Sequence, residues 1–303
     1  MYTEFFSLQE KPFSLTPDTQ FFFNKQSHRV ALNTMLGAVQ NNEGFIKIVG
    51  EVGTGKTLLC RKLLSLLDGK FKVIYIPNSY LTPNELKGLV ADEIGAEFTV
   101  GMPAYQLMGS IYRKLLQLVK DNVQVVLIVD EAQAMPRDTL EALRLLTNLD
   151  TEKRKLLQVI LIGQPELDET LDRSDLRQLK QRIVFTARLQ PLTLEGVAEY
   201  VGYRMSSAGC DRLVFSKSAL LYLYWSSGGI PRLINLLAHK ALIAAFNEGE
   251  SLVKPSHMAL AINNTPEARK RGRFIAQGIN WLWPIIGGVG GIALSAYVGS
   301  VVS

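Results

Sequence analysis

Cysteine and histidine are scarce in this chain of 303 residues, which holds two cysteines and three histidines. Cys60 and Cys210 lie far apart and form no C-x-x-C pair, so each fits a small buried thiol in a reducing compartment. The histidines are scattered, and no Ser-His-Asp pattern stands out. The first residues lack the basic and apolar stretches of a signal peptide. We therefore expect no His/Cys metal centre and no export signal.

A strong excess of one charge is also missing from most of the chain. The formal net charge is +5, but residues 264–303 alone carry +3, through four basic residues and one acidic residue. The remaining 263 residues carry only +2, so a broadly basic nucleic-acid-binding body is not indicated. The apolar fraction of 47% is ample for a folded core.

One stretch follows the pattern G-x-x-x-x-G-K-T between an apolar run, residues 45–49, and a helix-like run, residues 58–64. Its glycines let backbone N–H groups point at phosphate oxygens, and the helix start adds the positive end of its dipole. In such a P-loop, Lys56 reaches the β- and γ-phosphates and the Thr57 hydroxyl binds Mg²⁺. We therefore expect ATP and Mg²⁺ to bind here. The expected contacts are Gly50, Glu51, Val52, Gly53, Thr54, Gly55, Lys56, Thr57 and Leu58.

Short apolar runs alternate with helical patterns as far as residue 190. We expect strands at residues 45–49, 71–76, 123–130, 157–162 and 183–187. Thr82 and Glu85 form a capping box for a helix, and Ser27 and Asp138 are expected to cap two others. Because strands separated by helices need crossover connections, the pattern predicts an α/β fold. Its mostly parallel sheet would lie between layers of helices.

Polar side chains follow the third and fourth expected strands. Asp130 and Glu131 end the apolar run 125–129, and Gln164 follows the fourth strand. At a strand end beside a P-loop, Asp130 suits Mg²⁺ through water, and Glu131 suits polarising the attacking water. Gln164 is placed to contact the γ-phosphate and that water. The alternatives are a helix cap for the carboxylates and an ordinary turn residue for Gln164.

Three arginines are further candidates. Arg177 and Arg182 precede the fifth strand, where an arginine could reach a neighbouring subunit's γ-phosphate. A solvated basic helix face is the alternative for either residue. Arg232 begins a helix in the second half of the chain, where it could close over the nucleotide. A structural salt bridge is its alternative.

We expect the chain to have five parts. They are an approach segment at 1–44, an α/β core at 45–190, a helical domain at 191–263, a basic linker at 264–280 and an apolar segment at 281–302. The approach segment would pack on a larger body and could cover an adenine ring, or act as a plain packing arm. Thr193 is expected to cap the first helix of the helical domain.

The apolar segment 281–302 is long enough for a membrane-spanning helix, which needs about 20 residues. The basic residues of the linker precede it, so the positive-inside rule places the body in the cytoplasm. The alternative is a hydrophobic helix that docks on a partner protein.

With these elements assembled, residues 1–263 resemble the AAA+ ATPases. More narrowly, they are similar to the ExeA/GspA secretion-ATPase group and to the related ATPase of MSHA-type pilus biogenesis (MshM). The motifs that carry the resemblance are Pro12-Phe13, Pro17-Asp18, the P-loop, Asp130-Glu131-Ala132-Gln133, Gly163-Gln164-Pro165-Glu166-Leu167, Gln181-Arg182-Ile183 and Gly228-Gly229-Ile230-Pro231-Arg232-Leu233-Ile234-Asn235. The segments around Gly163 and Gly228 are far more specific than the two Walker motifs.

The resemblance implies a P-loop NTPase with a three-layer α-β-α core, a helical lid, ATP hydrolysis and nucleotide-dependent homo-oligomers. Matched by position, Lys56 and Thr57 would belong to the Walker A motif, and Asp130 and Glu131 to the Walker B motif. Gln164 would be the sensor 1 residue, Arg182 the arginine finger and Arg232 the sensor 2 residue. Secretion members can carry a periplasmic peptidoglycan-binding domain after the span. This chain stops at Ser303, which favours the pilus-biogenesis member.

We therefore expect an ATPase anchored in the bacterial inner membrane by one helix. Its ATPase domain would face the cytoplasm and serve a type IV pilus or type II secretion machine, whose inner-membrane components would be its partners. Two alternatives remain: a DNA-binding transposition regulator, which the near-neutral body disfavours, and a nucleotide-switched scaffold with negligible turnover.

Overall fold

A computed structural model describes residues 2–16, 18–24, 26–67, 69–99, 101–151 and 154–269. The chain forms two compact units. One is an α/β unit, Pro17–Gln190, and the other is a helical unit that combines Met1–Thr16 with Pro191–Ser303. The expected apolar segment at 281–302 lies outside the described residues. Among the residues that are described, no helix is both long and apolar enough to cross a membrane.

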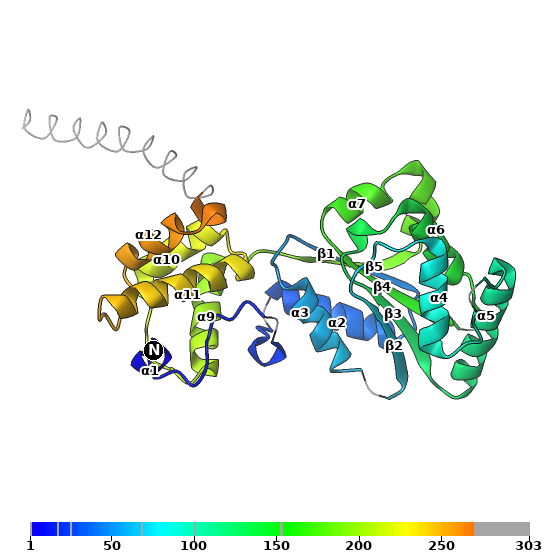
Figure 1. The fold of residues 1–303 in the computed structure, drawn as a ribbon, viewed down its shortest axis with the longest axis horizontal. Coiled ribbons are helices and arrows are strands. Elements are labelled where there is room, and N and C mark those ends of the chain that lie inside the picture. Colours follow the sequence, from blue (N-terminus) through cyan, green and yellow to red (C-terminus); the bar gives the residue numbers. More distant parts are fainter. Residues whose placement is uncertain are drawn as a thin grey trace, which may run out of the picture. The chain divides into compact units, whose positions relative to one another are not determined.

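The α/β unit is built on a five-stranded sheet of order β2-β3-β4-β1-β5 (Figure 1). Every pairing in this sheet is parallel, which confirms the expected mostly parallel sheet. The carboxyl ends of neighbouring strands therefore meet at one edge. The strands are β1 (Phe45–Gly50), β2 (Phe71–Ile76), β3 (Gln124–Val129), β4 (Leu157–Gly163) and β5 (Ile183–Leu189).

Two layers of helices cover the sheet (Figure 1). Alternate side chains of each strand point to opposite faces. Thus Ile46 and Ile48 pack with α2 and α3, whereas Leu127 and Val129 pack with the helices of the other layer. The first layer holds α2 (Gln26–Gln40) and α3 (Lys56–Leu64), and the second holds α4 (Pro83–Ile94), α5 (Ala104–Lys120), α6 (Arg137–Leu146), α7 (Glu166–Leu171) and α8 (Arg177–Gln181). Short 3-10 turns form at Thr19–Phe21, Ala132–Ala134 and Ser174–Leu176.

The capping box at α4 is confirmed, because the Thr82 hydroxyl accepts from the Glu85 N–H and the Glu85 carboxylate accepts from the Thr82 N–H. Two other expected caps are wrong. Helix α6 begins directly after Pro136, so Asp138 lies inside its first turn. Helix α2 begins at Gln26, and the Ser27 hydroxyl instead accepts from the Gln190 N–H at 3.2 Å.

The described part of the helical unit contains four helices after residue 191, where a helical domain was expected, and a short helix near the amino terminus. The expected cap at Thr193 is confirmed. A sharp turn connects α10 to α11, because Gly228 ends α10 in the left-handed region and Pro231 starts α11. Gly229 has a φ of +73°, and a Cβ there would lie 2.1 Å from the Leu192 carbonyl oxygen. The helices are α1 (Tyr2–Phe5), α9 (Leu194–Ser207), α10 (Lys217–Ser227), α11 (Pro231–Asn247) and α12 (Pro255–Asn263).

The expected approach segment divides between the two units. Residues 2–16 pack on the helical unit, where Phe13 meets Phe215 edge to face at 6.0 Å and the Tyr2 hydroxyl lies 3.1 Å from His239 Nδ1. The buried Arg204 guanidinium donates to the Pro12 carbonyl oxygen. Only the later part of the segment, with α2, belongs to the α/β unit.

Candidate nucleotide site

The glycine-rich loop connects the end of β1 to the start of α3. Its fold depends on two left-handed residues, Gly53 with a φ of +81° and Gly55 with a φ of +95°. The Thr54 hydroxyl donates to the Glu51 carbonyl oxygen at 2.8 Å and so closes the turn. The N–H groups that begin α3 have no partner within their own helix, so this loop is suited to an anion.

Lys56, the first residue of α3, places a cation inside this loop. Its side-chain nitrogen donates to the carbonyl oxygens of Gly50 at 2.8 Å and Glu51 at 3.1 Å, and the residue is only 5% exposed. Burial lowers the pKa of Lys56, although the carboxylates of Glu131 and Asp130 oppose that shift. A buried ammonium beside helix N–H groups fits a phosphate chain, whose charge would offset the cost of burial.

Asp130 links the glycine-rich loop to the end of β3. Its Oδ2 accepts from the Thr57 hydroxyl at 3.0 Å and from the Tyr75 hydroxyl at 3.3 Å, and its Oδ1 accepts from the Glu131 N–H at 2.9 Å. A hydroxyl and a carboxylate in contact are hard oxygen ligands of the kind that Mg²⁺ uses together with nucleotide phosphates. Within the described ranges, no group of three or more His, Cys, Asp or Glu residues could hold a metal by itself.

Two glutamine amides hold the side chain of Glu131. Its Oε2 accepts from Gln164 Nε2 at 2.9 Å and from Gln133 Nε2 at 2.6 Å. Gln133 also accepts the backbone N–H of Gln164 through Oε1 at 3.0 Å, so the three residues form one network. Burial alone would raise the pKa of Glu131, but the two amide donors and the Lys56 charge outweigh it and lower the pKa. The carboxylate is therefore ionised at neutral pH.

The backbone at Glu131 adopts an unusual conformation. Its φ of +50° and ψ of +40° place it in the left-handed region, which non-glycine residues adopt rarely and at a cost of roughly 1–3 kcal/mol. The Ser79 hydroxyl donates to its carbonyl oxygen at 2.7 Å and helps to hold it there. This conformation turns the chain sharply after β3 and lets Gln133 reach back to the Glu131 carboxylate.

The structure adds residues that the sequence analysis did not assign to the site. Gln133, Tyr75 and Ser79 are three of them, and only the position of Gln133 two residues after Glu131 gave any local signal. His28 is the fourth. Its Nε2 lies 2.7 Å from the Thr54 carbonyl oxygen, and its Nδ1 is one of the few buried polar atoms without a partner among the described residues.

The three candidate arginines have different positions. Arg182 directly follows α8, and its guanidinium donates to the Thr147 hydroxyl at 3.0 Å, whereas Arg177 is exposed at the start of that helix. Arg232 follows Pro231 in the first turn of α11, within the helical unit. The contacts with a nucleotide phosphate that the sequence analysis assigned to these arginines stay predictions.

Comparison with known proteins places this site in a family. Residues 39–171 match the family model described as "AAA domain". General secretion pathway protein A of Aeromonas hydrophila is 41% identical over 272 residues, which are 90% of this chain and 50% of that protein. These matches support the ExeA/GspA family of AAA+ proteins for this chain. A P-loop fold of this kind implies nucleotide binding, usually with Mg²⁺.

The ExeA/GspA relative is longer than this chain, which spans half of its length. The comparisons support that family and do not single out the pilus-biogenesis member that the sequence analysis favoured. The relative's activity in a secretion pathway is therefore a basis for a proposal only.

Solved structures show the same fold at low sequence identity. Cdc6p from Pyrobaculum aerophilum is 19% identical with a TM-score of 0.61, over 86% of this chain and 70% of that one. ORC2 of Aeropyrum pernix is 16% identical with a TM-score of 0.57, over 82% and 72%. RuvB of Thermotoga maritima is 15% identical with a TM-score of 0.52, over 78% and 67%. These similarities establish the fold and nothing finer.

Proposed function

We propose that this chain is a Mg²⁺-dependent ATPase that assists assembly or regulation of a type II secretion machine or an MSHA-like type IV pilus at the bacterial inner membrane. One observation carries the proposal. A buried Lys56, a Thr57–Asp130 contact and an oriented Glu131 converge where β1 and β3 end. The match to the AAA domain model and the similarity to general secretion pathway protein A support the rest.

Different residues of the site would bind the phosphates and the Mg²⁺ ion during phosphoryl transfer. The loop N–H groups and Lys56 would bind the phosphates of ATP and orient them. Thr57 and Asp130 would hold Mg²⁺, which when bound neutralises charge on the phosphate oxygens. Asp130 is already fixed by Tyr75 and Thr57, so little reorganisation is required.

Glu131 would orient the attacking water. Its lowered pKa makes the carboxylate a weak base. We therefore infer that it acts by accepting a hydrogen bond from the water and polarising it, rather than by full removal of a proton. Gln133 and Gln164 fix the direction of the carboxylate and leave its other oxygen to face the water.

Two variants test this assignment. Glu131→Gln should retain ATP affinity but release phosphate far more slowly, because the amide cannot polarise the water. Lys56→Ala should lose ATP binding. Isothermal titration and a steady-state phosphate-release assay measure the two properties. If both purified variants hydrolyse ATP at the wild-type rate, the assignment is wrong, and if wild type binds ATP without turnover, a nucleotide-switched scaffold is the better description.

Regulation would come from the three sensing residues. Gln164 touches Glu131 directly, Arg232 would report the nucleotide to the helical unit, and Arg182 would complete the site of a neighbouring subunit. Release of Arg182 from Thr147 would cost about 1.5–3 kcal/mol, the net value of a hydrogen bond that involves one charged group. A bond from arginine to phosphate is stronger. Loss of ATP-dependent oligomers in Arg182→Ala, measured by sedimentation, tests this step, and oligomers that persist contradict it.

Attachment to the membrane is part of the proposal. The apolar segment 281–302, preceded by basic residues, would anchor the chain with its ATPase body in the cytoplasm. Recovery of the full-length chain in the soluble fraction after lysis would contradict this attachment.

A further inference from the structure

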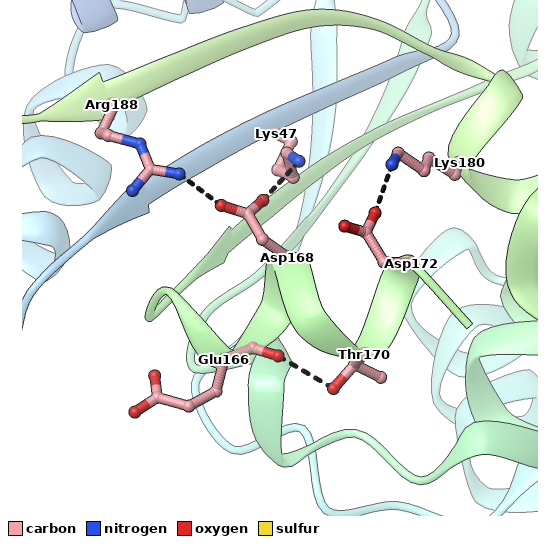
Figure 2. A network of polar contacts seen from close by, with 7 residues as sticks. All are labelled: Lys47, Glu166, Asp168, Thr170, Asp172, Lys180 and Arg188. Atoms are coloured by element: carbon pink, nitrogen blue, oxygen red, sulfur yellow. Dashed lines mark hydrogen bonds and ion pairs between the residues drawn. The ribbon is translucent and has the colours of Figure 1, made fainter.

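A partly buried ion pair connects the strand that leads into the glycine-rich loop to helix α7. Lys47, in the middle of β1, is 8% exposed, although its neighbours Ile46 and Ile48 are fully buried core residues. Its side-chain nitrogen lies 2.6 Å from Asp168 Oδ1. Asp168 belongs to α7, and its other oxygen, Oδ2, accepts from Arg188 on β5 at 2.5 Å. Figure 2 shows the Asp168 carboxylate between these two cations.

This carboxylate joins three segments that carry candidate site residues. Strand β1 ends at Gly50 of the glycine-rich loop, and β5 begins directly after Arg182. Helix α7 begins at Glu166, just after Gln164 and Pro165. Asp168 is the third residue of α7 and lies four residues after Gln164 in the chain.

The position of α7 controls where Gln164 lies. Leu167 of α7 packs tightly over the end of β4, where a Cβ on Gly163 would lie 2.9 Å from its side chain. Gln164 follows at once and donates to Glu131. A small shift of α7 along the sheet would therefore lengthen the Gln164–Glu131 hydrogen bond, which weakens steeply with distance and angle.

A partly buried ion pair contributes little to stability alone, because the cost of withdrawing Lys47 and most of Asp168 from water offsets much of their attraction. Well-packed apolar residues at Lys47 and Asp168 would give similar or greater stability. An ion pair does, however, specify one geometry, since Lys47 can satisfy its charge only where Asp168 lies.

We propose that Asp168 is a positioning residue, which through Lys47 and Arg188 fixes α7 so that Gln164 engages Glu131. The proposal deepens the proposed ATPase function and rests on it for its kinetic consequence. The same contact connects the nucleotide site to edge strand β5, which follows the candidate finger Arg182.

A second ion pair, at the carboxyl end of α7, provides a matched control. Asp172 pairs with Lys180 of α8, and both side chains are more than half exposed (Figure 2). Figure 2 draws no hydrogen bond or ion pair from this pair to β1 or β5, although the charge of Lys47 contributes weakly to lowering the pKa of Asp172. Its removal perturbs the same helix without freeing that helix from the sheet.

The test compares three variants of the full chain with wild type. Asp168→Asn keeps the size of the side chain and removes its charge. The double variant Lys47→Met/Asp168→Leu replaces the partly buried pair by apolar residues and leaves no unpaired buried charge. Asp172→Asn is the control. For each we would measure unfolding by guanidinium, ATP affinity, kcat and the ¹⁵N-detected side-chain amide resonance of Gln164, assigned with Gln164→Ala.

The expected result is a split between binding and turnover. Asp168→Asn and the double variant should bind ATP within about twofold of wild type and lose about tenfold in kcat, the effect of one weakened hydrogen bond to a charged group. Their Gln164 resonance should move toward the position of a solvent-exposed amide. Asp172→Asn should change neither property.

The double variant separates positioning from stability, because it should remain as stable as wild type. A wild-type Gln164 resonance in that variant would overturn the proposal, as would a resonance that moves equally in Asp172→Asn. If wild type lacks turnover altogether, the ATPase function fails, and the Gln164 resonance still decides the role of Asp168.

Discussion

Gln133→Ala is the substitution whose effect on the site is best defined by the structure. Gln133 donates to the ionised Glu131 carboxylate at 2.6 Å and accepts the Gln164 N–H at 3.0 Å. A hydrogen bond to a charged group contributes about 1.5–3 kcal/mol, so loss of the first bond alone should lower stability by about 2 kcal/mol. If the same energy is lost from the transition state, kcat falls about 30-fold.

The variant should also change the pH dependence of turnover. The amide of Gln133 is one of the donors that lower the pKa of Glu131, so its removal raises that pKa. The acidic limb of the kcat profile should then move to higher pH, because Glu131 must be ionised to act.

Phosphate release measured from pH 8 down to about pH 3.5, below the ordinary pKa of a glutamate, and guanidinium unfolding test both expectations. Gln106→Ala is the control, since Gln106 lies on the exposed start of α5, where its amide donates to the Tyr105 hydroxyl. A Gln133→Ala enzyme with a wild-type kcat and an unmoved acidic limb would refute this account of Glu131.

Two further predictions concern stability. Gly229→Ala should destabilise the helical unit by at least about 2 kcal/mol, because the added Cβ would clash with the Leu192 carbonyl and the φ of Gly229 is +73°. Gly202→Ala is the control. Gly202 is an exposed residue of α9 with open space around it, so this substitution should stabilise the unit by up to about 1 kcal/mol. Thermal unfolding of both variants decides this, and equal effects would contradict it. Burial lowers the pKa of His28, so the folded state binds fewer protons than the unfolded state and loses stability as pH falls below about 6.5. His28→Gln should reduce the loss between pH 7.5 and pH 5.5, and an unchanged loss in guanidinium unfolding would count against it.

The sequence predicted most of the sheet because all its strands except β5 are nearly continuous apolar runs. The expected ranges 45–49, 71–76 and 157–162 differ from the observed strands by no more than one residue at either end. Local capping chemistry was sufficient at Thr82 and Thr193. It failed at Asp138, since Pro136 has the extended conformation that precedes a helix and α6 starts one residue later.

Other features depend on contacts between distant residues and left little local trace. Helices α7 and α8 have six and five residues, too few for a periodic pattern. The amino-terminal residues were expected to form one segment, but aromatic contacts such as Phe13–Phe215 join their first part to the helical unit. The Gln133–Glu131–Gln164 network and the Lys47–Asp168 pair likewise arise only when β1, β3 and β4 lie side by side.

We propose that the Thr57–Asp130–Glu131 cluster hydrolyses ATP with Mg²⁺. Steady-state phosphate release by the purified full-length chain, measured in Mg²⁺ and again in excess EDTA, tests this proposal most directly. We expect sustained release with Mg²⁺ and none with EDTA. Equal release in both conditions, or none in either, would contradict it.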